Sequence, residues 1–265
     1  MSNRAAKKAV VIGDGSWGTT LALVLAKKGV EVCLWSAFPE QSKELREHRE
    51  NRRFLPGVKL PEKMSFSADP ATAVEGAELA VSVVPTQFLR SVAERFEDAM
   101  PGTLPVVTAT KGIEVETFQH PLKILQEVLG ERDYCVLTGP SHAEEVARGL
   151  PASVVSASKN PEFAAMVQAT FNCDTLRVYA TDDPEARFVI NDRALAQGIP
   201  AVLGGVIRFE GLVMGIHAGS GACFRCLFES PPEAGEVMSC ASAGVLGAMA
   251  GVVGHLQAER ALALL

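Results

Sequence analysis

The sequence of 265 residues has little of several features that would each mark a particular class of protein. Charged residues make up 21% and aromatic residues 6%, against 48% hydrophobic residues, and this balance excludes a disordered or fibrous chain. Basic residues are outnumbered by acidic ones, 25 to 31, which argues against a nucleic-acid partner or an anionic membrane. No apolar run reaches the roughly 18 residues that a membrane-spanning helix needs. We therefore expect no nucleic acid and no membrane among the partners.

An apolar leader and a dense set of cysteines are also missing. Met1-Ser2-Asn3-Arg4 leads directly into a strand-like run and lacks the apolar core of a secretory signal. Six cysteines in a chain of this length do not form a disulfide framework, and Cys33, Cys135 and Cys173 lie in apolar runs. We expect a reducing, cytoplasmic location.

Lysine is absent after Lys159, although arginine continues to Arg260, and glycine becomes dense after Gly198. Before this break, short apolar runs alternate with amphipathic stretches, a pattern that predicts βαβ units and a parallel sheet. We predict an α/β fold: a Rossmann-like doubly wound parallel sheet followed by a smaller α/β segment. The predicted domains are a dinucleotide-binding domain at 1–182 and a second segment at 183–265.

The apolar runs and the amphipathic stretches give a coarse assignment of elements. The predicted strands cover residues 9–13, 31–35, 77–84, 104–109, 134–138, 201–207 and 212–217. The predicted helices cover residues 19–29, 90–99, 120–128, 184–197 and a segment from about residue 241. A mixed-charge run from Glu40 to Arg53 predicts a solvated helix face.

A glycine-rich turn, Gly13-Asp14-Gly15-Ser16-Trp17-Gly18, follows the first predicted strand and opens a predicted helix. Gly13 permits the tight turn, Gly15 lets the backbone approach a pyrophosphate, and Gly18 lets the helix pack close to the sheet. The acid that usually binds the ribose should lie about 20 residues further on. That place is Trp35-Ser36, with neither an acid nor an arginine, so the choice between NAD and NADP stays open.

Four further motifs follow the glycine-rich turn in a fixed order. They are Asn51-Arg52-Arg53-Phe54-Leu55-Pro56-Gly57, Val84-Pro85-Thr86-Gln87-Phe88-Leu89-Arg90, Ala109-Thr110-Lys111-Gly112-Ile113-Glu114 and Gly139-Pro140-Ser141-His142-Ala143-Glu144-Glu145-Val146-Ala147. With this set, residues 8 to about 182 resemble the N-terminal domain of NAD(P)-dependent glycerol-3-phosphate dehydrogenases.

The resemblance implies hydride transfer between glycerol 3-phosphate and dihydroxyacetone phosphate, with NAD or NADP as cofactor. It implies roles at the matching positions: cofactor binding by Gly13, Gly15, Ser16, Trp17, Gly18, Lys111 and Ala143, and substrate binding by Lys111, Gly139 and Ser141. A lysine ammonium is suited to stabilising a developing alkoxide or to holding a phosphate. His142 is interpreted as a packing residue.

The resemblance ends near Thr181. The family continues into a helical domain in which a lysine accepts the substrate proton, and no lysine follows Lys159 in this chain. Since general-base catalysis contributes about 10²–10⁴-fold, we expect cofactor binding without useful turnover.

The rest of the chain, about 181–265, carries a second resemblance. It rests on the segment 181–192, Arg208-Phe209-Glu210-Gly211, Cys223-Phe224-Arg225-Cys226-Leu227-Phe228, Ser239-Cys240-Ala241-Ser242-Ala243-Gly244 and Leu256-Gln257-Ala258. These motifs are similar to the second half of the adenylyltransferases that activate sulfur-carrier proteins in molybdopterin and thiamine synthesis, relatives of ubiquitin-activating enzymes.

This second resemblance implies magnesium binding by Asp182, zinc binding by Cys223 and Cys226, and a reactive thiol at Cys240. Zinc prefers four ligands, and the remaining ones would have to come from Cys240, His217 or His255 by chance geometry. The phosphate-binding first half of that family is missing, so adenylation is not expected.

The most economical interpretation is a fusion joined near 179–187. We expect an NAD(P)-binding protein derived from the dehydrogenase. The alternatives are an adenylyltransferase-like module with zinc or a reactive cysteine, and a non-functional chimera. The expected partners are a small-molecule substrate, a sulfur-carrier protein and a second copy of the chain in a homodimer.

Overall fold

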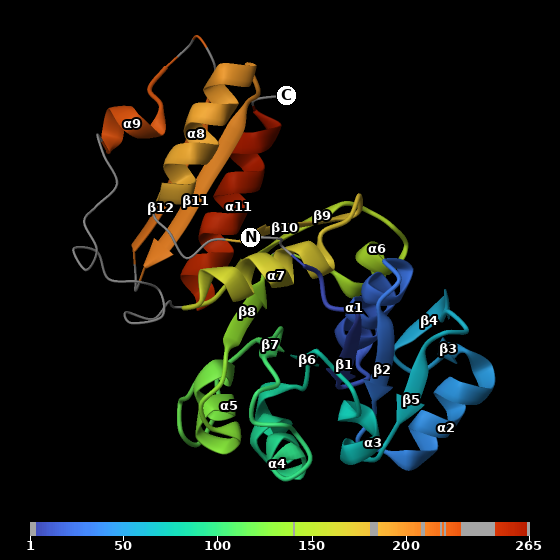
Figure 1. Cartoon of the computed structure of the whole chain (residues 1–265). Coiled ribbons are helices and arrows are strands. Elements are labelled where there is room, and N and C mark those ends of the chain that lie inside the picture. The colour runs from blue at the N-terminus through green and yellow to red at the C-terminus, as the bar shows by residue number, and fades with distance from the viewer. Residues whose placement is uncertain are drawn as a thin grey trace. The chain divides into compact units, whose positions relative to one another are not determined.

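The computed structural model of the protein describes residues 4–139, 141–180, 185–207, 210–217, 219, 221–228 and 247–263. The chain divides into two compact units, Met1–Asp182 and Asp183–Leu265, and each is described by itself (Figure 1). Two of the candidate residues, Asp182 and Cys240, lie outside the described residues.

The first unit is built on one eight-stranded sheet. Its strand order is β10-β9-β8-β7-β6-β1-β2-β5. The strands are β1 (Lys8–Ile12), β2 (Glu31–Trp35), β5 (Ser65–Ser67), β6 (Leu79–Ser82), β7 (Val106–Thr108), β8 (Tyr134–Thr138), β9 (Ala152–Ala157) and β10 (Leu176–Ala180). All neighbours pair in parallel except β8 and β9, which are antiparallel. The parallel sheet and its strands β1, β2, β6, β7 and β8 confirm the prediction from sequence, whereas β5, β9 and β10 were not predicted.

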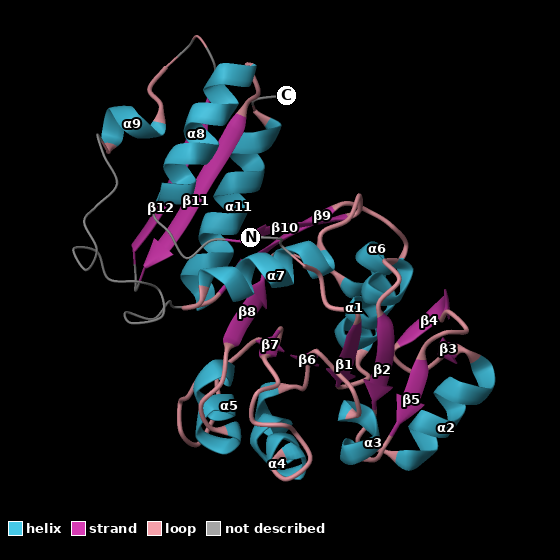
Figure 2. Cartoon of the chain, viewed as in Figure 1, coloured by secondary structure: helices cyan, strands magenta, loops and turns pink. Residues whose placement is uncertain are grey.

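Helices cover both faces of this sheet, as Figure 2 shows. They are α1 (Ser16–Lys27), α6 (Ala143–Ala147) and α7 (Pro161–Phe171) on one face, and α3 (Pro70–Val74), α4 (Thr86–Phe96) and α5 (Pro121–Leu129) on the other. Side chains of a strand alternate between the faces: Val11 packs in the cluster that contains Leu21, while Val10 and Ile12 pack in the one that contains Phe96. A fully buried aliphatic side chain such as Leu21 contributes about 1.5–3 kcal/mol, so two such clusters fix the sheet firmly.

The mixed-charge run forms α2 (Pro39–His48) and then leaves the helix. Arg49 adopts a left-handed conformation (φ 49°), and the chain continues into the short antiparallel pair β3 (Glu50–Asn51) and β4 (Leu55–Lys59). The helical prediction for 40–53 is therefore confirmed for its first part and wrong for its last residues.

The second unit contains α8 (Glu185–Gln197), β11 (Ala201–Ile207), β12 (Glu210–Ile216), α9 (Phe224–Leu227) and α11 (Gly247–Leu262). The two strands form an antiparallel ribbon, with a small buried cluster of Leu203, Ile216 and Phe224. Helix α11 packs on both strands, and the amide end of the Gln257 side chain lies next to Gly204.

The strand order of the first unit decides where a ligand can bind. β1 lies between β2 and β6, so the chain leaves β1 toward one side first and returns on the other side later. In open α/β sheets, ligands bind at the carboxyl ends of the strands at such a reversal of strand order. No helix within the described residues is both long and apolar enough to span a bilayer.

Candidate dinucleotide and substrate site

The glycine-rich turn fits tightly against the strands beside it. Gly13 has a φ of 113°, and its amide donates a hydrogen bond to the carbonyl of Trp35 at 3.1 Å. A Cβ at Gly18 would lie 2.0 Å from the carbonyl oxygen of Gly13, closer than any real contact. The turn therefore holds the start of α1 against the ends of β1 and β2.

The start of α1 is open to a ligand. No side chain caps the helix, and its first backbone bond runs from the amide of Thr19 to the carbonyl of Gly15 at 2.9 Å. The amides before it are left without helical partners. A Cβ at Gly15 would meet no atom within 4 Å, so there is free space directly beside these amides. The arrangement fits a diphosphate, which helix N-termini bind through free amides and the helix dipole.

Trp17 contributes to this site through its backbone. Its indole packs against the core cluster on the α1 face, and its Nε1 is buried without a hydrogen-bond partner among the described residues. The side chain thus anchors the helix in the core, and it is the amide that belongs to the free N–H groups of the first turn.

Asn51 holds the glycine-rich turn in place through its side-chain hydrogen bonds. Its Nδ2 donates to the carbonyl of Asp14 and to Oγ1 of Thr19, both at 2.7 Å, and its Oδ1 accepts from the amide of Phe54 at 3.1 Å. Asn51 is fully buried. Asn51 lies within one of the sequence motifs, but no role was predicted for it, because nothing in the sequence shows that β3 lies next to the turn.

The predicted substrate residues come together at a single backbone atom. Nζ of Lys111, after β7, donates to the carbonyl of Gly139 at 3.1 Å, and Oγ of Ser141 donates to the same oxygen at 3.4 Å. Gly139 follows β8, the next strand of the sheet. Lys111 is exposed, so its ammonium group can exchange this carbonyl for a ligand.

Helix α4 fixes the loop that carries Lys111. Oγ1 of Thr86 donates to the carbonyl of Lys111 at 2.7 Å, and Nε2 of Gln87 donates to the carbonyl of Ile113 at 2.9 Å. Arg90 forms a two-pronged ion pair with Glu114, at 3.1 and 2.9 Å, which lowers the pKa of that carboxyl. The spacing of these residues places them along one side of the first turns of α4.

Ala143 is linked directly to α1. Oγ1 of Thr20 donates to the carbonyl of Ala143 at 3.1 Å, and both residues are buried. Helix α6, which follows Gly139 and Ser141 in the chain, is thereby tied to α1. His142, by contrast, is exposed at the start of α6, so the interpretation of it as a packing residue is wrong.

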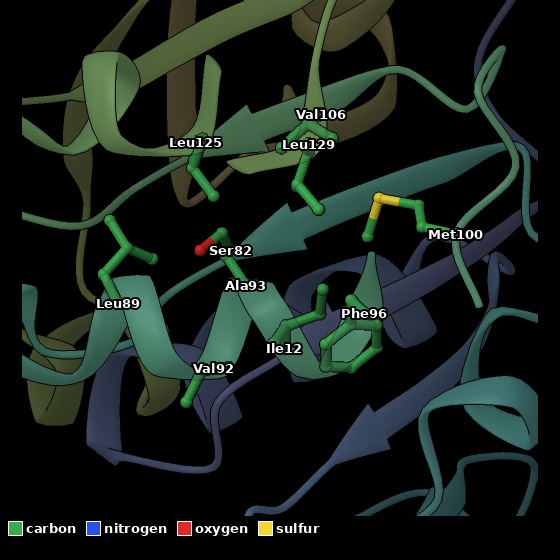
Figure 3. Close-up of a pocket in the computed structure, with 10 residues that line it drawn as sticks. All are labelled: Ile12, Ser82, Leu89, Val92, Ala93, Phe96, Met100, Val106, Leu125 and Leu129. Carbon is green, nitrogen blue, oxygen red and sulfur yellow. The ribbon is translucent and has the colours of Figure 1, made fainter. Parts of the chain in front are cut away.

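A cavity beneath α4 is a packing gap rather than a ligand site (Figure 3). Its volume is about 10 Å³, enough for one water at most. It is lined by Ile12, Ser82, Leu89, Val92, Ala93, Phe96, Met100, Val106, Leu125 and Leu129. Nine of these ten side chains are apolar, and the hydroxyl of Ser82 is the exception.

The second unit places Cys223 and Cys226 side by side, with their Sγ atoms 3.7 Å apart. Burial raises the pKa of the Cys223 thiol, but hydrogen bonds, first of all with Cys226, outweigh it and lower the pKa overall. Arg225 binds both carboxylate oxygens of Asp192 at 2.8 Å and holds the pKa of that carboxyl at about 2.

Among the described residues, no further ligand joins this thiol pair. Across the residues with described positions, no cluster of three or more His, Cys, Asp or Glu side chains could hold a metal ion, whereas structural zinc needs four ligands. His217 and His255, the histidines considered from sequence, do not complete a site there.

A glycine-rich turn at the switch point, free amides and an open space at Gly15 are features of a Rossmann-type fold. The comparisons make this specific. The family model described as NAD-dependent glycerol-3-phosphate dehydrogenase N-terminus matches residues 8–164, and the chain belongs to that family. A second model, the ThiF family, matches residues 143–265 and so overlaps the first over residues 143–164.

Individual relatives agree with the first assignment. The glycerol-3-phosphate dehydrogenase [NAD(P)+] of Citrifermentans bemidjiense is 45% identical over 181 residues, 67% of this chain and 54% of the relative. The enzyme of the same name from Moorella thermoacetica is 46% identical over 65% of this chain and 51% of its own length. The crystal structure of glycerol-3-phosphate dehydrogenase from Coxiella burnetii superimposes with a TM-score of 0.64 at 32% identity, covering 72% of this chain and 60% of that one. The chain thus spans about half the length of the curated relatives it matches.

Proposed function

We propose that the first unit binds NAD(H) or NADP(H) along the edge where the parallel strands end. The observation that carries this proposal is the free space beside Gly15 at the uncapped start of α1. A diphosphate in that space would accept hydrogen bonds from the amides of Gly15, Ser16 and Trp17. When bound, the cofactor supplies the hydride acceptor or donor.

We further propose that a small phosphorylated polyol or ketone, glycerol 3-phosphate or dihydroxyacetone phosphate, binds between Lys111 and the segment Gly139–Ser141. The exposed ammonium of Lys111 is a compact positive charge at the end of β7. It would stabilise negative charge on the substrate oxygen or bind the phosphate. The hydrogen bonds from α4 to its loop keep that ammonium in place.

Turnover by this chain should be very low. Oxidation of an alcohol requires a base that takes the hydroxyl proton, and the family places a lysine for this purpose in a helical domain. Since no lysine follows Lys159, the chain has no counterpart of that base. The proposal is therefore a binder of cofactor and substrate in which the chemical step is slowed about 10²–10⁴-fold.

Titration of NADH by fluorescence tests the binding, and NADH oxidation in the presence of dihydroxyacetone phosphate tests the turnover. The folded chain should bind NADH in the micromolar range and oxidise it barely above the background rate. In the wild type, dihydroxyacetone phosphate should change the affinity for NADH. In Lys111→Met it should not. Lys159→Met, which removes an exposed lysine elsewhere, should behave as the wild type. A folded protein that does not bind NADH contradicts the proposal.

A second candidate function rests on the paired thiols of the ThiF-matching region. We propose that Cys223 and Cys226 form an open thiol pair that engages the tail of a sulfur-carrier protein. Elemental analysis after zinc loading should show no stoichiometric metal, and Cys223→Ser should leave that result unchanged. One zinc per chain, lost in Cys223→Ser, would instead show a metal site and contradict the open thiol pair.

A further inference from the structure

In the structure a carboxylate lies at the end of β2, although the residues directly after β2 in the sequence include no acid. In many dinucleotide folds an acid at this place hydrogen-bonds a ribose hydroxyl of the cofactor. Here β2 ends at Trp35 and is followed by Ser36. However, Oδ2 of Asp14, from the glycine-rich turn, accepts a hydrogen bond from Oγ of Ser36 at 3.0 Å. The acid thus comes from the turn after β1 and reaches the end of β2 in space.

The backbone of Asp14 is held in this position from several sides. Its carbonyl accepts hydrogen bonds from Nδ2 of Asn51 at 2.7 Å and from Oγ1 of Thr19 at 3.2 Å. The amide of Gly13 binds the carbonyl of Trp35, which ties the turn to the end of β2. The carboxylate is therefore fixed between the two strand ends that flank the expected position of the adenosine ribose.

The buried position of the Asp14 side chain disfavours its charged form. Asp14 is only 8% exposed, and no salt bridge to it is found among the described residues. Burial raises its pKa, while the hydrogen bond from Ser36 and the charge of Arg53 act in the opposite direction. A buried carboxyl group that forms no ion pair costs free energy, and such groups concentrate at functional sites.

We propose that Asp14 accepts the 2′-hydroxyl of the adenosine ribose and repels a 2′-phosphate, so that the chain selects NAD(H) over NADP(H). This inference rests on the proposed function. The residues after β2, Ser36, Ala37 and Phe38, include no cation that would hold a 2′-phosphate. Two arginines lie in the neighbourhood: Arg53 stacks over the ring of Phe54 at 4.9 Å, and Arg95 over the ring of Trp35 at 4.6 Å.

Parallel titrations of NADH and NADPH test the inference. The wild type should bind NADH at least about tenfold more tightly than NADPH, because a phosphate would face the Asp14 carboxylate at short range. In Asp14→Asn, which keeps the shape and removes the charge, the ratio should fall to about threefold or less, mainly through tighter NADPH binding. Asp98→Asn, an exposed acid elsewhere in the same unit, should keep the wild-type ratio.

Each outcome has a definite meaning. Equal affinities for the two cofactors in the wild type, or tighter binding of NADPH, would overturn the inference while leaving the proposed function intact. An unchanged ratio in a folded Asp14→Asn protein would do the same. If neither cofactor binds, the proposed function fails, and the role of Asp14 fails with it. The wild-type ratio decides the matter even if the variant does not fold.

Discussion

The two units of this chain differ in how strongly their structure is determined. In the first unit, an eight-stranded sheet is covered on both faces by helices, and two large clusters of buried side chains fix it. In the second unit, the buried cluster found among the described residues consists of Leu203, Ile216 and Phe224 beneath a two-stranded ribbon. An isolated two-stranded ribbon has little stability of its own and depends on helices that pack against it.

This difference explains where the chain can support a binding site. A site must be held in place by surrounding structure, and the turn at Gly13–Gly18 is held by strands, a helix and the buried Asn51. Of the thiols in the second unit, Cys223 is the N-cap of the short helix α9 and Cys226, which is exposed, lies on that helix. The following substitutions test whether the first unit holds its site rigidly and whether the second unit is less tightly packed.

The largest effect is expected for Gly18→Ala. The added Cβ would lie 2.0 Å from the carbonyl oxygen of Gly13, and neither backbone segment can move without disturbing the sheet. We expect a loss of about 3 kcal/mol in the free energy of unfolding, together with loss of NADH binding. Urea denaturation and NADH titration measure the two effects. Gly102→Ala is the matched control, since a Cβ there meets nothing within 4 Å, and an equal loss in both variants would show that the turn is not tightly packed.

A smaller but still large effect is expected for Asn51→Ala. The change leaves buried polar groups of the turn without their partners, at a cost of about 2–3 kcal/mol. Asn160→Ala removes the cap of α7 in the same unit and should cost about 1 kcal/mol. Thermal and urea denaturation measure the loss of stability in both variants. If Asn51→Ala were the milder of the two, the turn would not depend on Asn51.

For Asp14→Asn we expect a more stable protein at neutral pH. The folded state holds the Asp14 proton more tightly than the unfolded state, whose pKa is near 3.8, so the native structure loses stability as pH rises through the raised pKa. Asparagine removes this penalty. The stability advantage of the variant should therefore be full at neutral pH and disappear below the unfolded pKa. A variant that is less stable than the wild type at pH 7 would contradict the assignment of Asp14 as a costly buried carboxylate.

The smallest effect is expected in the second unit. Gly251 and Gly254 lie on the exposed side of α11, and a Cβ at either position meets nothing within 4 Å. Because alanine favours a helix by about 0.8–1 kcal/mol over glycine, Gly254→Ala should stabilise the unit by up to that amount. Circular dichroism during thermal unfolding measures the gain. A destabilised variant would show that α11 is packed more tightly than its exposed glycines indicate.

Much of the fold was predictable from local patterns. The strands β1, β2, β6, β7 and β8 are short apolar runs bounded by polar residues, and the glycine turn stands in its usual context between strand and helix. The strands β9 and β10 were not predicted, because Ala152–Ala157 and Leu176–Ala180 carry mixed side chains and depend on their neighbours in the sheet.

The candidate site was predictable where one segment carries the whole signal, as at Gly13–Gly18. The meeting of Lys111 with Gly139 and Ser141 follows from the order of β7 and β8 in the sheet, and the family resemblance had indicated it. The partnership of Asp14 with Ser36 could not be predicted. It joins residues from different strand ends, and the sequence rule places the acid on the second strand instead of the turn.

Hydrogen exchange with and without NADH is the most direct measurement of whether the cofactor binds at the start of α1. Bound NADH should slow exchange at the amides of residues 15–19 and around Lys111, and leave residues 185–228 and 247–263 unaffected. Protection confined to the second unit, or no protection at residues 15–19 in a protein that binds NADH, would contradict a dinucleotide site at the glycine-rich turn.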